Sequence, residues 1–252
     1  MLKINDLHFR YGRRSPEILR GIELELNAGE IGVLLGKNGA GKTTLFSNII
    51  GIERPSSGSI TLDGEQLVGM APSKRAARIA YVPQDISFGS LTVFDTVLLG
   101  RVAYFGLRAG ADDRRAVSAI LDEMGLAELA ERNADALSGG EKQKVAIARA
   151  IAQQPKLMIF DEPTGNLDLA GTQLIAEQAK KLAQEKNIAV LVAIHDLNSA
   201  LELGDRFFFM KDGRIAYTGG TDIITEELLR DIYGVDTTIV EHNGRKIILG
   251  GK

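Results

Sequence analysis

The chain has 252 residues, 44% of them apolar, and a formal net charge of −3 from 30 basic and 33 acidic side chains. A chain of this length buries about three quarters of its unfolded surface in one or two domains. It holds no cysteine, which excludes disulfides, thiolate metal sites and cysteine nucleophiles. Its charges are interspersed and form no basic stripe, so we expect no nucleic-acid partner.

No apolar run reaches the roughly 20 residues that cross a bilayer. The first residues, Met-Leu-Lys-Ile-Asn, also lack the features of a secretory signal. We therefore expect a cytoplasmic chain.

Strand patterns come first along the chain. Residues 3–10 and 21–26 alternate between apolar and polar side chains, and residues 58–64 do so before a turn, which predicts half-exposed strands. Residues 31–35, Ile-Gly-Val-Leu-Leu, form an unbroken apolar run typical of a buried strand.

A glycine-rich segment, Gly-Lys-Asn-Gly-Ala-Gly-Lys-Thr-Thr, follows that run at residues 36–44. It fits the phosphate-loop pattern G-x-x-x-x-G-K-[ST] and has the strand and helix context that the pattern requires. Lys42 can reach the β- and γ-phosphates and Thr43 can offer a hydroxyl to Mg²⁺. The alternative is a glycine-rich turn that binds nothing. The candidate nucleotide-binding residues of this segment are Gly36, Asn38, Gly39, Gly41, Lys42, Thr43 and Thr44.

Helical periodicity replaces the strand pattern from residue 85 to residue 155. This stretch contains Leu-Ser-Gly-Gly-Glu at residues 137–141, which opens a predicted helix over 142–153. Two glycines and a serine at a helix N-terminus form a second anion-binding position. A single nucleotide rarely needs two such positions.

Two carboxylates end the next buried strand, at residues 157–160. In a parallel sheet, ligands gather at the carboxyl ends of strands, so we expect Asp161 to hold Mg²⁺ and Glu162 to orient the water that attacks the γ-phosphate. Acidic residues that simply face solvent are the alternative. The charged helix expected over residues 173–186 would present a solvated surface face.

The last third returns to strands. Residues 188–194 form another buried run that ends at His195, and Asp212-Gly213 and Asn243-Gly244 predict two hairpin turns.

Taken together, the phosphate loop, Leu137-Ser-Gly-Gly-Glu141 and Leu157-Met-Ile-Phe-Asp-Glu-Pro163 resemble the ATP-binding cassette (ABC) family. The resemblance implies an α/β phosphate-loop NTPase fold with a mixed sheet core, an antiparallel β subdomain and a helical subdomain. Residues 1–84 and 156–252 would form the nucleotide-binding core with its β subdomain and C-terminal hairpins, and residues 85–155 the helical subdomain. The family most often has Gln where this chain has Glu141, which puts the role of that position in doubt.

The resemblance also implies roles for single residues. Tyr11 would stack on adenine, Gln84 would sense Mg²⁺ and water, and His195 would contact the γ-phosphate. Asp168, in Asn166-Leu-Asp168, would link the two active sites of a dimer, although it is also suited to cap a helix. Ser138, Gly139 and Gly140 would cover the γ-phosphate that the other subunit holds.

The function that the resemblance implies is ATP hydrolysis with Mg²⁺ by two copies that close head to tail. Integral membrane permease subunits, with a substrate-binding protein, would recruit the pair to the inner face of the membrane. The segment Leu98-Leu-Gly-Arg-Val-Ala-Tyr-Phe-Gly-Leu107 resembles importers of iron-siderophore, haem and cobalamin, but lacks their Pro-His after Gly-Arg. Its apolar part, 102–107, is a candidate groove for a permease helix.

Three alternatives remain open at this point. Pro163-Thr-Gly-Asn-Leu-Asp168 also resembles cassettes that extract lipoproteins or expel macrolides. A soluble cassette of the iron-sulfur assembly type is a second alternative. A plain phosphate-loop kinase is the third, and it would have no use for residues 137–141.

Overall fold

The computed structural model describes residues 1–105, 108–163 and 169–250. These residues form two compact units, Met1–Gly69 with Gln178–Lys252, and Met70–Glu177. The expected helical segment, 85–155, lies wholly within the second unit, whose bounds are wider. The expected boundaries of core and helical subdomain stay a prediction.

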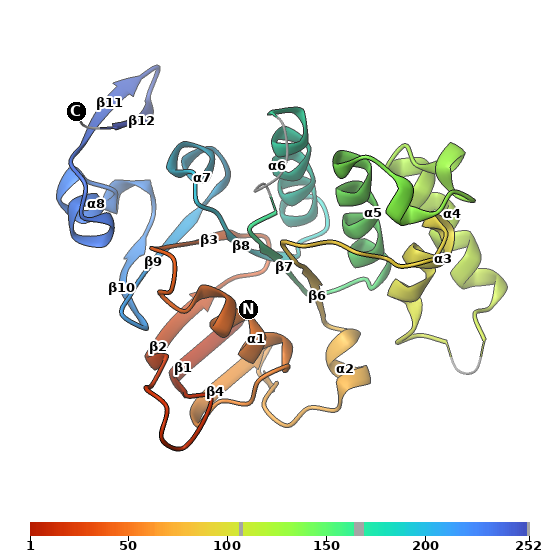
Figure 1. The fold of residues 1–252 in the computed structure, drawn as a ribbon, viewed down its shortest axis with the longest axis horizontal. Coiled ribbons are helices and arrows are strands. Elements are labelled where there is room, and N and C mark those ends of the chain that lie inside the picture. The colour runs from red at the N-terminus through yellow and green to blue at the C-terminus, as the bar shows by residue number, and fades with distance from the viewer. Residues whose placement is uncertain (106–107, 164–168, 251–252) are drawn as a thin grey trace. The chain divides into compact units, whose positions relative to one another are not determined.

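The first unit carries two sheets, a C-terminal hairpin and the helices around them (Figure 1). Its elements are β1 (Leu2–Phe9), β2 (Leu19–Leu26), β3 (Ile31–Leu35), α1 (Lys42–Ile50), β4 (Ser57–Leu62), β5 (Glu65–Gln66), β8 (Ala189–Ala193), α7 (Leu197–Leu203), β9 (Arg206–Lys211), β10 (Arg214–Gly219), the 3₁₀ turn η4 (Thr221–Ile223), α8 (Glu226–Tyr233), β11 (Thr237–His242) and β12 (Arg245–Gly250).

The second unit is mainly helical and includes one pair of strands. Its elements are α2 (Pro72–Ala76), β6 (Ile79–Val82), α3 (Val93–Leu98), η1 (Leu99–Arg101), α4 (Ala111–Glu123), η2 (Ala127–Leu129), η3 (Ala134–Ala136), α5 (Gly139–Ala152) and β7 (Leu157–Asp161). Helix α6 (Leu169–Gln184) begins in this unit and ends in the first.

A buried parallel sheet forms the centre of the first unit. Strand β3 lies between β8 and β9 and is parallel to both, and β10 adds an antiparallel edge (Figure 1). Every residue of β3 and β8 is buried, as unbroken apolar runs predict for strands covered on both faces. Phe207, Phe208 and Phe209 of β9 and Phe46 of α1 are among the largest buried side chains.

The antiparallel sheet of the first unit has the order β2-β1-β4-β5. Strand β1 buries alternate residues, which confirms the half-exposed strand that its sequence predicts. The expected turns are confirmed as well. Asp212-Gly213 and Asn243-Gly244 join β9 to β10 and β11 to β12, with all four residues at positive φ, because this backbone geometry matches the twist of hairpin strands.

Helix α5 is the central element of the second unit and contacts α3, α4 and β6. The helix is buried on most of its faces, and Val145, Ile147 and Ile151 are among its buried residues. The helix begins at Gly139, three residues before the predicted start. Gly100 lies against the Arg149 carbonyl so closely that a Cβ would collide with it.

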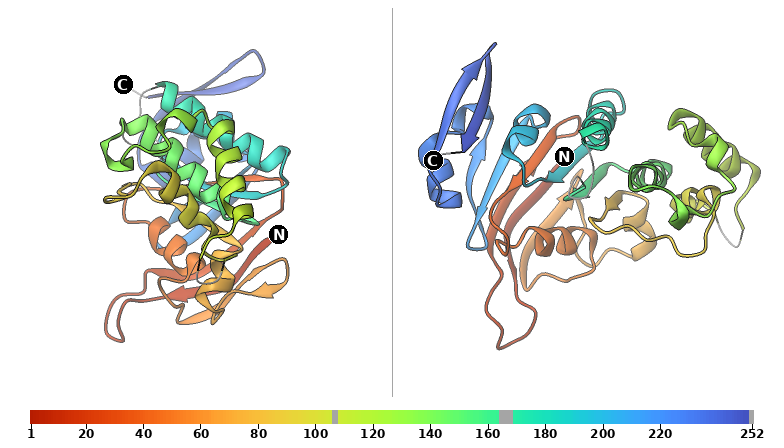
Figure 2. Two further views of the ribbon diagram at one scale, coloured as in Figure 1. Left: turned by 90° about the vertical axis from the view of Figure 1, so that its right-hand side faces the viewer. Right: turned by 45° about the horizontal axis from the view of Figure 1, so that its top comes forward.

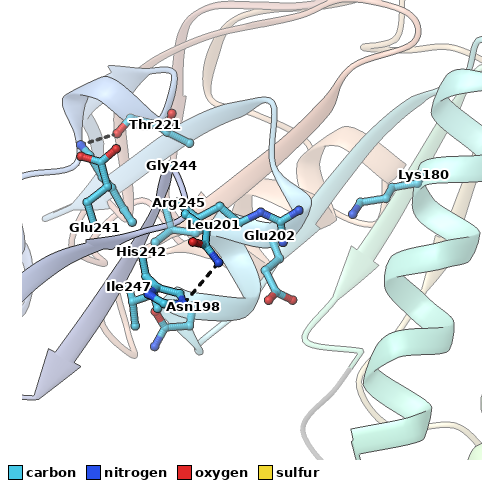
Figure 3. Close-up of a pocket in the computed structure, with 12 residues that line it drawn as sticks. Lys180, Asn198, Leu201, Glu202, Thr221, Glu241, His242, Gly244, Arg245 and Ile247 are labelled. Carbon is cyan, nitrogen blue, oxygen red and sulfur yellow. Dashed lines mark hydrogen bonds between the residues drawn. The ribbon is translucent and has the colours of Figure 1, made fainter.

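The C-terminal hairpin β11–β12 stands beside α7 and α8 (Figure 2, right). Asn198 of α7 donates to the Ile248 carbonyl over 3.0 Å and accepts from the Ile248 N–H over 2.8 Å. Lys246 donates to the carbonyls of Thr221 and Ile224, both at 2.8 Å. Between hairpin, α7 and Lys180 lies a pocket of about 1110 Å³ whose lining mixes cations and carboxylates (Figure 3).

Of the helices within the described residues, none combines the length and the apolar character that crossing a membrane requires.

Candidate functional site

The phosphate-loop segment turns tightly between β3 and α1 in the first unit. Gly36, Gly39 and Gly41 have φ values of 150°, 81° and 107°, which favour glycine. A Cβ on Gly36 would collide with the Met210 carbonyl, so β9 holds the loop closely. Within the described residues no side chain caps α1 at Gly41. The first N–H groups of α1 therefore face the loop with the positive end of the helix dipole.

Lys42 and Thr43 sit where the pattern predicts. The ammonium of Lys42 donates to the Gly36 carbonyl over 3.0 Å, and the residue as a whole is 5% exposed. Thr43 is exposed at the first turn of α1. The loop therefore presents one buried cation, backbone donors and one hydroxyl, which together suit a polyphosphate and its metal.

Tyr11 lies next to this loop. Its hydroxyl is 3.4 Å from the Thr44 hydroxyl, and its ring packs edge-on against buried Phe9 with the centroids 4.9 Å apart. The side chain is 63% exposed. An exposed aromatic face beside a phosphate loop can stack on a nucleobase. The fold thus places Tyr11 close to Thr44, another candidate nucleotide-binding residue.

His195 follows strand β8 at the same sheet edge as the loop. Leu34 pairs with Ala193 in the parallel register of β3 and β8, so Gly36 and His195 each lie two residues beyond a paired position. His195 is exposed, and Asp196 caps α7 by accepting the Ser199 N–H over 2.7 Å. The turn thus keeps the histidine at the carboxyl end of the strand.

The second unit repeats this arrangement with β6 and β7. Val82 pairs with Phe160, so Gln84 and Glu162 both lie two residues beyond that pair, at one sheet edge. Gln84 is exposed and Glu162 is half-buried. Glu162 has a φ of 49°, a left-handed conformation that costs a non-glycine residue about 1 kcal/mol or more.

Asp161 is 4% exposed and accepts a hydrogen bond from the Tyr81 hydroxyl over 3.0 Å. Burial raises the pKa of Tyr81 well above its ordinary value, and the Asp161 carboxylate raises it further. The phenol therefore stays protonated and keeps donating. Sequence reasoning gave Tyr81 no role, although a tyrosine within a buried strand beside one that ends in Asp161 was the available signal.

The segment Leu137-Ser-Gly-Gly-Glu141 opens α5 as a capping box. Ser138 donates its hydroxyl and its N–H to Glu141 Oε2 over 2.7 and 2.9 Å, and the Glu141 N–H donates back to the Ser138 hydroxyl over 3.4 Å. The Ser138 hydroxyl is the main reason that the pKa of Glu141 is lowered. Gly139 is exposed, Gly140 is half-buried, and both have open space at the Cβ position, so this helix start can approach another surface.

Asp135 is a further residue that sequence reasoning missed. Its carboxylate accepts the N–H groups of Phe88 and Gly89 over 2.9 and 2.8 Å and the Ser87 hydroxyl over 3.3 Å. The Phe88 N–H is the main cause of its lowered pKa. Asp135 therefore ties the segment after Gln84 to the segment before Ser138.

Two predicted positions lie outside the described residues. Asp168 belongs to 164–168, and Leu107 belongs to 106–107. Their roles remain predictions.

The residues expected to hold Mg²⁺ offer a hydroxyl from Thr43, a carboxylate from Asp161 and an amide oxygen from Gln84. Mg²⁺ prefers hard oxygen ligands and usually takes only one or two carboxylates, with phosphate oxygens and water completing its shell. A buried carboxylate held by a phenol, with neutral oxygens as further donors, fits that preference.

A family model described as ABC transporter matches residues 19–165 of the chain. The chain belongs to the ABC transporter family. As a member it is an ATP-binding subunit with ATPase activity, and its phosphate-loop NTPase fold is that of ABC cassettes.

Curated ABC relatives extend over nearly the whole chain. An uncharacterized ABC transporter ATP-binding protein of Methanocaldococcus jannaschii is 37% identical over 99% of this chain and 97% of its own. A hemin import ATP-binding protein of Myxococcus xanthus is 36% identical over 92% of both chains. A phosphonates import ATP-binding protein of Rhodopseudomonas palustris is also 36% identical, over 93% of this chain and 87% of its own.

Solved ABC structures show the same fold. An inward-facing putative metal-chelate type ABC transporter superposes with a TM-score of 0.84 at 30% identity, over 98% of this chain and 95% of its own. A dimeric ABC cassette in a post-hydrolysis state with ADP and Pi superposes with a TM-score of 0.77 at 28% identity, over 87% and 98%.

Proposed function

We propose that this chain is the ATP-hydrolysing subunit of an importer for metal chelates of the iron-siderophore, haem or cobalamin type. The main support is its likeness, over 98% of its length, to the metal-chelate type transporter. The hemin import relative supports the same substrate class. Two copies would close head to tail over two MgATP, on the cytoplasmic side of a membrane permease that works with a substrate-binding protein.

Within each ATP site we assign binding and chemistry to separate residues. Tyr11 stacks on adenine, and Lys42 with the N–H groups of the loop holds the phosphates. Glu162 orients the attacking water, and His195 and Gln84 contact the γ-phosphate and that water. Mg²⁺, held by Thr43, Asp161 and Gln84, supplies charge neutralisation when bound.

The partner subunit completes the site in this proposal. Its Ser138, Gly139 and Gly140 cover the γ-phosphate with a helix N-terminus, and Asp168 links the two sites. Because these contacts need the γ-phosphate, hydrolysis removes them and lets the pair reopen. The permease uses the conformational difference between the closed pair with ATP and the reopened pair after hydrolysis.

The permease contact is proposed for an apolar surface of the second unit. Leu99, Val102 and Tyr104 are 48%, 54% and 43% exposed. Tyr104 is held by its hydrogen bond to the Gln153 carbonyl, over 2.6 Å, and by Arg101 over its ring. An exposed apolar surface suits the apolar face of an amphipathic helix. Unchanged assembly of a Tyr104→Ala plus Phe105→Ala variant would contradict this placement.

Co-purification with membrane proteins tests the proposal. Tagged Glu162→Gln chain, with MgATP present, is expected to bind nucleotide, dimerise and retain a polytopic permease from detergent-solubilised membranes in a two-to-two ratio. The matched control is Glu185→Gln, an exposed residue just after α6, which should hydrolyse ATP normally. Recovery of a soluble partner or of the homodimer alone would favour a non-transport cassette.

A second candidate function is import of phosphonates, favoured by the phosphonates import relative. Extraction of lipoproteins and efflux remain alternatives as well. ATPase activity of the reconstituted complex separates them. Stimulation by hemin or a ferric siderophore with its binding protein supports the metal-chelate proposal, and stimulation by a phosphonate contradicts it.

A further inference from the structure

His8, on strand β1, lies between the carboxylates of Asp6 and Glu17. Its Nε2 is 3.0 Å from Asp6 Oδ1 and its Nδ1 is 3.1 Å from Glu17 Oε1. A neutral imidazole has one donor and one acceptor, so one of these contacts would place two acceptors together. Only the imidazolium can donate to both carboxylates.

Glu17 belongs to the connection that carries Tyr11. Residues 10–18 join β1 to β2, and the Ile18 N–H closes their base by donating to the Phe9 carbonyl over 2.8 Å. Glu17 Oε1 also accepts from Arg10 over 3.4 Å. The carboxylate thus fastens the far end of this loop to the strand that leads into it.

The position of Tyr11 depends on the same contacts between the two ends of the loop. Its ring rests edge-on against Phe9, the residue after His8, and its hydroxyl reaches Thr44 of the phosphate-loop segment. Because Tyr11 is mostly exposed, few other contacts fix it. If the contacts between the two ends of the loop were lost, the Tyr11 ring could move away from the position in which a nucleobase stacks on it.

We propose that His8 is a positioning residue for the nucleotide, whose imidazolium, held between Asp6 and Glu17, fixes the loop that presents Tyr11. This inference rests on the proposed stacking of adenine on Tyr11. It implies that affinity for MgATP depends on the charge of His8.

The charges around His8 set the direction of this dependence. Its hydrogen bond to Asp6 is the main cause of a raised pKa, burial opposes the rise, and Glu17 adds to it. Arg10 faces Glu17, Arg20 of β2 pairs directly opposite His8, and Arg214 approaches Gly21, beside the imidazole. The imidazolium contacts are therefore complete below the ordinary pKa of 6.5 and are lost as pH rises through the raised value.

The experiment measures affinity for MgATP by calorimetry between pH 6.5 and 9, with full-length chain in the Glu162→Gln background. We expect affinity to fall about threefold to fivefold over this range, the size of one modest hydrogen bond, and to stay level in an added His8→Gln variant. Phosphate groups titrate near pH 6, so the difference between the two proteins is the quantity of interest. An equal slope in both would overturn the inference.

Two probes separate this inference from the proposed function. Inorganic tripolyphosphate fills the phosphate loop without a base, and its affinity should not respond to His8→Gln. An equal response would show that His8 acts on the whole site and not through Tyr11. If Tyr11→Ala weakens MgATP binding while His8→Gln does not, only the role of His8 fails. If Tyr11→Ala has no effect, the stacking itself fails, and the inference with it.

Controls guard against a purely structural effect. His242→Gln changes an exposed histidine of the C-terminal hairpin and should leave the pH profile unchanged. If His8→Gln does not fold, Glu17→Gln, which keeps the histidine but removes its second carboxylate, carries the test and should flatten the profile as well. The chain has three histidines, so nuclear magnetic resonance can follow the His8 ring directly.

Discussion

The hydroxyl of Tyr81 donates to Asp161 Oδ2 over 3.0 Å, from the interior of β6 to the end of its parallel neighbour β7. The bond uses one lone pair of a carboxylate that is 4% exposed. It restricts the rotation of Asp161. In the proposed Mg²⁺ site, a phenol placed in this way would orient Asp161 as a ligand without contacting the metal.

Tyr81→Phe should therefore lower kcat about threefold to tenfold and raise the Mg²⁺ concentration needed for half-maximal ATPase activity. Unfolding free energy should fall by about 1.5–3 kcal/mol, since a hydrogen bond to a buried carboxylate is lost. The control is Tyr217→Phe, which removes a phenol that donates to Asp231 over 3.3 Å on the surface of β10. A Mg²⁺ dependence equal to that of the parent protein would show that Tyr81 does not orient Asp161.

Ser138→Ala should lose both a helix cap and the proposed contact with the partner's nucleotide. The cap is worth about 1 kcal/mol of unfolding free energy. Thr225→Ala removes a similar cap from α8, where the Thr225 hydroxyl accepts the Leu228 N–H over 3.2 Å. Urea denaturation should show similar losses for both variants, whereas ATP hydrolysis should fall at least tenfold for Ser138→Ala alone. Equal hydrolysis by both variants would speak against the proposed role of Ser138.

The two hairpin turns offer a matched pair of glycines. Gly213 and Gly244 have φ values of 77° and 73°, so alanine at either position costs about 1 kcal/mol in strain. A Cβ on Gly213 would also collide with the Ile18 carbonyl, whereas Gly244 has open space around it. We expect Gly213→Ala to be destabilised by about 3 kcal/mol and Gly244→Ala by about 1. Thermal unfolding compares the two, and equal midpoints would contradict the collision.

Asp135→Asn should loosen the segment 87–89 and lower the urea midpoint at neutral pH, because an amide presents only one acceptor oxygen to the donors of Phe88, Gly89 and Ser87. The lowered pKa of Asp135 sets the pH dependence. Its stabilising effect is present above the ordinary pKa of 3.8 and is lost as pH falls through the lowered value. The difference from the parent protein should therefore shrink in acid. Asp122→Asn, at an exposed position of α4, should show no comparable difference.

Local chemistry explains which parts of the fold were predictable from sequence. Strand β3 spans the five residues that its apolar run predicts, and the turns at Gly213 and Gly244 follow from the dipeptides that favour them. Contacts between distant residues could not be read in this way. Tyr81 and Asp161 are 80 residues apart, and Asp135 and Phe88 are 47 apart. Such pairs arise only when the strands and helices are assembled.

Helix α6 shows a different limit of prediction from sequence. Its charged residues predict a solvated surface face, and the structure adds a buried face that this prediction did not include. Ile175, Ala179 and Leu182 form a buried stripe at helical spacing. Charged residues on the other faces masked this periodicity, because a helix needs only one apolar face to pack.

Asn198 occupies the position of a missing neighbour strand for β12, since its amide both donates to and accepts from the Ile248 backbone. The hairpin is thus fixed near its end and beside Lys246, while the turn at Asn243-Gly244 is exposed. A fluorophore or a short epitope inserted at that turn would leave the anchoring contacts in place. The C-terminal hairpin therefore offers an attachment point for optical reporters of the working protein.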